Sequence, residues 1–115
     1  AILGDMLELG KYTEEEHLKV GEKVSEIADI LITVGPRSKI MRDTAKDKIK
    51  EENIFCFDKY DEVIPVIQKI ISSGDIILIK GSQKMRLEKV VEKIMKDKDN
   101  KKSLLCRQDK EWEER

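Results

Sequence analysis

Apolar residues in this chain either form short unbroken blocks or recur every three or four positions within longer, charged segments. The unbroken blocks, "AIL", "ILITV", "IFCF" and "IILI", lie at 1–3, 30–34, 54–57 and 76–79. They are rich in Ile, Leu, Val and Phe, which is typical of strands buried on both faces. The sequence therefore predicts four strands at these positions.

The longer segments between the blocks have the spacing of helices with one apolar face, and we expect helices over about 13–28, 38–51, 60–73 and 83–96. Thr13 followed by Glu16 has the form of a capping box at the start of the first helix. Ser82 stands at the expected N-cap of the fourth. Strands that alternate with helices predict an α/β domain with a mainly parallel sheet and helices on both faces.

The chain of 115 residues is long enough for one domain. The mixed-charge run "KDKDNKK" after the fourth helix indicates a solvated linker, so residues 97–115 are expected to form a linker and a terminal tail. In that tail Leu104, Leu105 and Trp112 are the apolar residues that would pin a short element onto the body.

Composition excludes several classes of function. Charged residues make up 41% of the chain but sum to a net charge of −1, so no overall field favours nucleic acid or an anionic membrane. The apolar blocks are too short to span a bilayer and no signal peptide is apparent, so we expect a soluble cytoplasmic protein. The two cysteines, Cys56 and Cys106, are far apart and have no metal-ligand spacing, so no metal site is expected.

Ligands of parallel α/β sheets collect at the carboxyl ends of the strands, which selects the turns after the first, second and fourth strands. Asp5 and Glu8 follow the first strand, and Lys80, Gly81 and Ser82 follow the fourth. A lysine beside an expected helix N-terminus favours a cradle for a carboxylate or phosphate. Ordinary strand-to-helix turns account for the same residues, and no P-loop motif is present in the chain.

Two further residues lie near this edge in the predicted fold. His17, the only histidine, is in the apolar stripe of the first helix. That position is typical of a packed, hydrogen-bonded core residue, although the first turn of a crossover helix also lies beside the ligand edge. Arg37, after the second strand, is either a rim residue that meets an anion or solvated surface.

Two long stretches, "AILGDMLELGKYTEEEHLKVGE" and "GDIILIKGSQKMRLEKVVEKI", resemble the two signatures of the C-terminal domain of the Mur ligases. They stand in the family's order, with "ADILITVG" between them, and the resemblance covers residues 1–96. It implies a Rossmann-like three-layer fold. The family's D-x-Y-N-A-N-P stretch is missing, so the resemblance also implies a domain that is incomplete at its N-terminus and lacks its first βα unit.

The resemblance further implies a part in peptidoglycan precursor synthesis, in a ligase that uses ATP and Mg²⁺ to join D-alanyl-D-alanine to UDP-N-acetylmuramoyl-tripeptide. In the family a central domain holds the phosphate-binding loop and most ATP and Mg²⁺ contacts, and an N-terminal domain binds UDP. Both are the implied partners of this chain, which alone is expected to be inactive. Asp5 and Glu8 would then orient the incoming ammonium group, and Lys80, Gly81 and Ser82 would hold the carboxylate of the dipeptide.

Two other interpretations remain open at this stage. One is a C-terminal domain from a different Mur ligase or from a ligase of the folylpolyglutamate synthetase type. The other is a non-catalytic α/β binding module; receiver-type signalling domains share the pattern, but Asp58 is expected to begin a helix and not to end the third strand.

Overall fold

Four parallel strands form the centre of the molecule in a computed structural model that describes residues 1–114. The strands are β1 (Ile2–Gly4), β2 (Leu31–Val34), β3 (Ile54–Phe57) and β4 (Ile79–Lys80), in the order β3-β2-β1-β4. All three pairings are parallel, as the alternation of strands and helices predicts. The carboxyl ends of β1, β2 and β4 therefore meet at one edge of the sheet.

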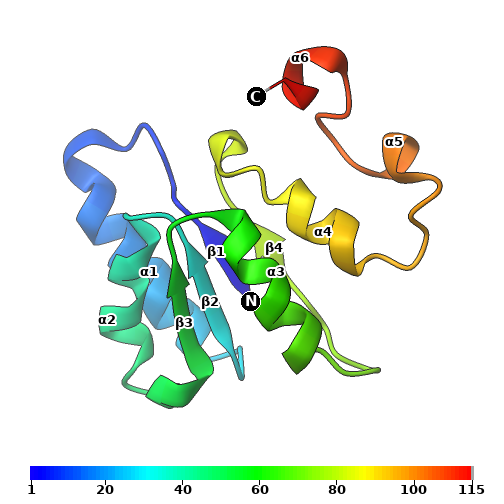
Figure 1. The fold of residues 1–115 in the computed structure, drawn as a ribbon. Coiled ribbons are helices and arrows are strands. Elements are labelled where there is room, and N and C mark those ends of the chain that lie inside the picture. The colour runs from blue at the N-terminus through cyan, green and yellow to red at the C-terminus, as the bar shows by residue number, and fades with distance from the viewer. Residues whose placement is uncertain (115) are drawn as a thin grey trace.

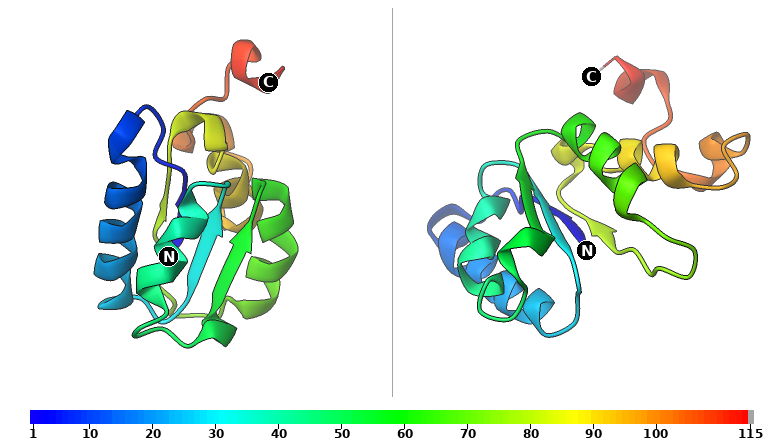
Figure 2. Two further views of the ribbon diagram at one scale, coloured as in Figure 1. Left: turned by 90° about the vertical axis from the view of Figure 1, so that its left-hand side faces the viewer. Right: turned by 60° about the horizontal axis from the view of Figure 1, so that its bottom comes forward.

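Helices cover both faces of this sheet, which confirms the predicted three-layer α/β fold (Figures 1 and 2). On one face lie α1 (Thr13–Ser25) and α2 (Met41–Ala45), and on the other lie α3 (Tyr60–Ile70) and α4 (Glu88–Ile94). Two short helices follow, α5 (Lys101–Leu104) and α6 (Lys110–Glu113).

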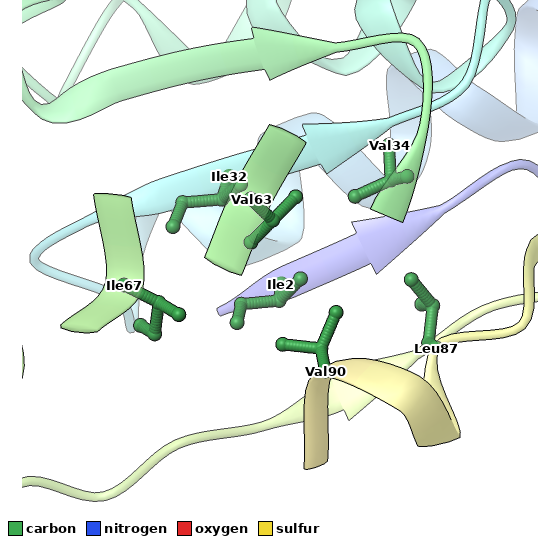
Figure 3. Close-up of a cluster of buried hydrophobic side chains, with 7 residues drawn as sticks. All are labelled: Ile2, Ile32, Val34, Val63, Ile67, Leu87 and Val90. Atoms are coloured by element: carbon green, nitrogen blue, oxygen red, sulfur yellow. The ribbon is translucent and has the colours of Figure 1, made fainter. Parts of the chain in front are cut away.

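Each face has its own hydrophobic core, because successive strand residues point to opposite sides of the sheet. Ile2, Ile32 and Val34 meet side chains of α3 and α4 on one side, as Figure 3 shows. Leu3 and Leu31 meet α1 and α2 on the other. Burying an aliphatic side chain of this size contributes about 1.5–3 kcal/mol, so these two clusters hold the layers together.

Helices α1 and α2 pack unusually closely because Gly21 has no side chain. A Cβ atom at this position would lie 2.2 Å from the backbone oxygen of Met41. Thr44 adds a hydrogen bond across the same contact, donating from its hydroxyl to the Leu18 carbonyl at 2.8 Å. This packing fixes α1, and with it His17, relative to the sheet.

The predicted capping box at Thr13 is wrong. A short 3-10 helix, η1 (Gly10–Tyr12), precedes α1, and the Thr13 hydroxyl donates to the Gly10 carbonyl at 2.8 Å. No side chain caps α1, which ends at Ser25. The second predicted helix is also interrupted: it consists of η2 (Ser38–Ile40), α2 and, further on, η3 (Glu51–Asn53).

The fourth strand is shorter than its apolar block predicts. Leu78 still accepts a hydrogen bond from the Ile2 amide at 2.8 Å, but Ile76 is 98% exposed and lies outside the strand. The reason is the register: β4 pairs only with β1, and β1 begins at Ile2, opposite Ile79. Within residues 1–114, the residues further upstream in the block have no neighbouring strand to pair with.

The fourth helix begins five residues later than predicted. A 3-10 turn, η4 (Gln83–Met85), follows Ser82, and Arg86 then adopts a left-handed backbone with φ of 53°. Because a left-handed residue ends a right-handed turn, α4 starts only at Glu88. The expected helix dipole beside Lys80 is therefore not there.

The tail contacts the body through Trp112, one of the three apolar residues expected to pin it. The Trp112 carbonyl accepts a hydrogen bond from Arg86 at 2.7 Å, whereas Leu104 is 60% exposed and does not pin the tail. Arg115, the last residue of the predicted linker and tail, lies outside the described residues. Between residues 1 and 114, no helix is long and apolar enough to cross a membrane.

Candidate functional site

The turn after β1, residues Asp5–Glu8, is the centre of the candidate site, and its first residue is buried. Asp5 is only 2% exposed. Its Oδ1 atom accepts a hydrogen bond from the Ser38 amide at 2.6 Å, and its own amide donates to the Val34 carbonyl at 3.1 Å. Asp5 therefore lies beneath the expected acidic rim and ties the turn after β1 to the start of η2.

His17 holds the next residue of the turn. Its Nε2 atom accepts a hydrogen bond from the Met6 amide at 3.1 Å, and its Nδ1 atom is 2.6 Å from the Thr13 carbonyl. A carbonyl can only accept, so Nδ1 carries the hydrogen and the ring is neutral. The side chain is completely buried. It is the packed, hydrogen-bonded residue that the apolar stripe indicated, and it lies under the turn.

Ser82 holds the third residue. Its Oγ atom accepts a hydrogen bond from the Leu7 amide at 2.9 Å, and its own amide donates to the Asp5 carbonyl at 3.0 Å. Ser82 was predicted to be the N-cap of the next helical element, and it is the N-cap residue of η4. Its hydroxyl makes no cap hydrogen bond, however, and binds Leu7 of the neighbouring turn instead.

Gly81 begins the turn after β4, whereas Lys80, expected in that turn, is the last residue of the strand. A Cβ atom on Gly81 would lie 2.9 Å from the Cα of Gly4, so glycine lets the ends of β1 and β4 approach closely. Lys80 is paired with Leu3 across the sheet, and both line a groove whose walls come from both faces of the sheet. Lys80 and Ser82 thus belong to different surroundings, and the structure does not bring them together as one cradle.

Glu8 is the residue of the turn that the fold leaves free. Its side chain is exposed, and no hydrogen bond or ion pair engages it within the described chain. Its backbone has φ of 65°, a left-handed conformation that is uncommon for residues other than glycine. Strained backbone of this kind concentrates at functional sites. Glu8 is thus the acid that the turn presents at the sheet edge.

Arg37 lies next to the hydrogen bond between Ser38 and the buried Asp5. It is exposed and immediately precedes Ser38, whose amide binds Asp5. Gly35, at φ of 112°, passes so close to Asp5 that a Cβ there would be 2.4 Å from Oδ1. Arg37 therefore stands at the rim with its side chain in solvent.

Sequence reasoning located this edge but missed how it is assembled. Ser38 was not among the expected site residues, and the Leu7–Ser82 bond joins residues that are 75 positions apart. The partner of a side chain across such a distance has no local signal. Only the parallel topology, which brings the strand ends together, makes the contact foreseeable.

A second polar cluster lies at the start of α4 and involves charged groups. Glu88 is 5% exposed; its two oxygens bind Arg86 Nε at 2.5 Å and Arg107 Nη2 at 3.0 Å. Burial raises the pKa of this carboxyl, but the hydrogen bonds from both arginines outweigh it and hold the pKa below its ordinary value. Both guanidinium groups also lie over the Trp112 ring, at 5.3 and 5.9 Å. We call Arg86, Glu88, Arg107 and Trp112 the tail clamp.

Among residues 1–114, no group of His, Cys, Asp or Glu side chains is arranged to hold a metal ion. The carboxylate of Asp5 is already engaged by Ser38. The chain also has no phosphate-binding loop motif.

Comparison with known proteins gives a consistent family. Residues 1–83 match the family described as "Mur ligase, glutamate ligase domain". The UDP-N-acetylmuramoyl-tripeptide--D-alanyl-D-alanine ligase of Bacillus subtilis (strain 168) is 28% identical over 95 residues, which are 82% of this chain and 21% of that protein. The enzyme of the same name from Rickettsia prowazekii (strain Madrid E) is 33% identical over 96 residues, 80% of this chain and 20% of that protein.

Among solved structures, a crystal structure of MurF from Acinetobacter baumannii has the same fold. It superposes with a TM-score of 0.65 at 23% identity, covering 78% of this chain and 20% of that one. The chain thus spans about a fifth of the length of the relatives that it matches.

Proposed function

This chain belongs to the Mur ligase family, and on that premise we propose that it forms the C-terminal domain of an ATP-dependent ligase. The ligase would join D-alanyl-D-alanine to UDP-N-acetylmuramoyl-tripeptide in peptidoglycan precursor synthesis. The observation that carries the proposal is the match to two relatives of this one name across about four fifths of the chain. As in the first interpretation of the sequence, the setting would be the cytoplasm.

In this proposal the edge formed by β1, β2 and β4 faces the acceptor substrate. The amino group of the free dipeptide is an ammonium group. This nitrogen must be oriented toward the activated carboxyl group and lose a proton before it attacks. Glu8 is exposed and unpaired in the described structure, so it can accept hydrogen bonds from that ammonium. Asp5, buried beneath it, contributes by fixing the turn.

The carboxylate of the dipeptide requires a cation, and Arg37 is the candidate at this rim, because it is exposed and forms no ion pair in residues 1–114. Lys80, the other predicted cation, lines the groove beside β4 instead. Gly81 and Ser82 would shape the turn after β4 next to Glu8, and Ser82 also keeps its bond to Leu7. ATP and Mg²⁺ would be held by the rest of the ligase, together with the UDP-tripeptide.

A groove of about 730 Å³ supports the proposal that the domain has a further βα unit ahead of Ala1. Its lining is mainly aliphatic and comes from both faces of the sheet, including Leu3, Val24, Ile27, Ile67, Ile71 and Leu78. The edge of β4 beside it pairs with no strand in the described chain. A preceding strand would complete the ladder, and its helix would cover the aliphatic lining.

Steady-state kinetics of the complete ligase test the proposal, with each substrate varied in turn. Replacing Glu8 by Gln removes the charge but keeps the size, and we expect KM for D-alanyl-D-alanine to rise about tenfold to a hundredfold. KM for ATP should stay unchanged. Glu52→Gln is the matched control, because Glu52 is equally exposed but lies before β3, at the opposite edge.

The alternatives give different results in the same assay. Turnover with another amino acid in place of D-alanyl-D-alanine would assign the chain to a different ligase of this kind. No turnover with any acceptor would favour a binding module. The 115-residue chain alone should neither hydrolyse ATP nor form an amide bond, and turnover by it would contradict the proposed division between domains.

A further inference from the structure

We propose that His17 is a positioning residue of the acceptor site, which acts through the backbone of the turn and never touches substrate. With Ser82 and Ser38 it forms a latch that holds the Asp5–Glu8 turn in place before any substrate binds. The effect on catalysis rests on the proposed function of this edge, whereas the latch itself can be tested without substrate.

The latch consists of contacts from three separate elements to three successive residues, Asp5, Met6 and Leu7. Asp5 is bound by Ser38 of η2, Met6 by His17 of α1, and Leu7 by Ser82 ahead of η4. The sequence separations are 33, 11 and 75 residues. A displacement of the turn as a whole would break contacts to all three elements at once.

The bond from Met6 depends on the state of the His17 ring. Nδ1 faces the Thr13 carbonyl and carries the hydrogen, which leaves the lone pair of Nε2 as the acceptor for the Met6 amide. The ring is 0% exposed, so water cannot replace it as the acceptor without opening the contact between α1 and the sheet. An apolar ring at this position would leave the Met6 amide with no partner.

The consequence for the site appears at Glu8, which follows directly after the three anchored residues. Glu8 has a left-handed backbone that a residue with a side chain rarely adopts. Such a conformation persists only where surrounding contacts determine it. We infer that the anchored residues before Glu8 supply those contacts, and that releasing Met6 lets Glu8 relax away from the presented position.

Amide hydrogen exchange of the 115-residue chain, followed residue by residue by NMR, tests the latch directly. In His17→Phe, which keeps a buried ring, the Met6 amide should exchange at least tenfold faster than in the wild type. In Ser82→Ala the same should hold for the Leu7 amide. Val24→Ala is the control, because Val24 is a buried residue of the same helix that does not contact the turn through a hydrogen bond.

Kinetics of the complete ligase then separate positioning from general destabilisation. His17→Phe should raise KM for D-alanyl-D-alanine about tenfold with KM for ATP unchanged, and His17→Gln, which offers an acceptor oxygen, should recover part of the loss. Val24→Ala should lower Tm without this KM effect. If the Phe variant does not fold, Ser82→Ala makes the same comparison through the Leu7 amide.

Two results would overturn the proposal. One is a Met6 amide that exchanges no faster in His17→Phe than in Val24→Ala, which would remove the latch itself. The other is a fast Met6 amide with no change in any KM, which would leave His17 as a packing residue. If Glu8→Gln also has no effect on KM, the proposed function of the edge fails while the exchange result still stands.

Discussion

The turn after β1 and the C-terminal tail are both held against the body of the domain, but by different means. In the turn, three consecutive residues each have a separate partner, and two of the three bonds are between neutral groups. In the tail, Arg107 binds the buried carboxylate of Glu88. The Trp112 carbonyl binds Arg86, which forms an ion pair with the same carboxylate. The contacts of the turn are spread over three partners, whereas the charged contacts of the tail clamp meet at the Glu88 carboxylate.

This difference indicates what each attachment can achieve. Separate bonds to successive residues fix the direction of the backbone at every step, which is what the presentation of Glu8 requires. The tail is joined to the body at fewer points, by the tail clamp and by the partly exposed Glu92–Lys101 pair, and Leu104 beside that pair is 60% exposed. The contacts of the turn fix the position of Glu8, whereas those of the tail clamp attach the tail to α4.

The largest effect is expected from Glu88→Ala. Removing one partner of a buried ion pair leaves uncompensated charge and typically costs about 3–5 kcal/mol. Arg86 is 8% exposed, so its guanidinium would have to be solvated by release of the tail. Urea unfolding gives the free energy change, and limited proteolysis shows whether residues 97–114 are released.

Glu92→Ala is the matched control for that experiment. Glu92 binds Lys101 at 2.9 Å, but the lysine side chain is 40% exposed, and such a pair contributes about 0–1 kcal/mol. Equal losses in the two variants would contradict the idea that the tail attachment is concentrated on Glu88.

Acid pH should release the tail. Because the pKa of Glu88 in the folded protein lies below its ordinary value, its stabilising contribution is fully present above that ordinary value. It is lost as the pH falls through the lower, folded-state value. Protease sensitivity of the tail should therefore stay constant from pH 7 to about 5 and rise only below 4.5. Release of the tail at pH 6 would show that another group controls it.

A smaller loss is expected from Gly35→Ala, which acts on the turn. The new Cβ would meet Asp5 Oδ1 at 2.4 Å, and φ of 112° is a strained conformation for alanine. Backbone strain of this type costs about 1–3 kcal/mol. Thermal unfolding measures the loss, and Gly74→Ala, with φ of 93° and no atom near the new Cβ, separates the strain from the contact with Asp5.

The smallest effect belongs to the exposed ion pairs on α1. Lys19 binds Glu15 and Glu16, and hydrogen bonds to these two acids, Glu15 first, raise the pKa of the lysine above its ordinary value. All three side chains are in solvent, where such pairs have little net effect on stability. Lys19→Ala should leave Tm within experimental error, and a fall comparable with that of Glu88→Ala would contradict this ranking.

Most of the fold could be predicted from the sequence, since β2 and β3 are continuous apolar blocks and their pairing follows from the helices between them. The extent of β4 could not, because it depends on where β1 begins. The late start of α4 could not either: it results from a left-handed arginine, and no residue type at that position signals such a backbone.

For the candidate site, the sequence predicted that Asp5, Glu8, His17 and Ser82 lie near one edge of the sheet, and the structure brings the segments that carry them together there. The sequence did not indicate that Asp5 is buried or that the hydroxyl of Ser82 binds Leu7. Those features depend on contacts between distant segments, which form only when the parallel strand ends meet. The role of each residue toward substrate stays a prediction, which steady-state kinetics of the complete ligase would test.

The contacts around the Asp5–Glu8 turn imply that it is fully formed in the absence of substrate. Native-state amide exchange of the unmodified chain tests it most directly, by comparing Met6 and Leu7 with Val34 in β2 and with Lys98 in the exposed run after α4. We predict that the Met6 and Leu7 amides are protected at a level close to that of Val34. Exchange of both amides as fast as that of Lys98 would contradict the account.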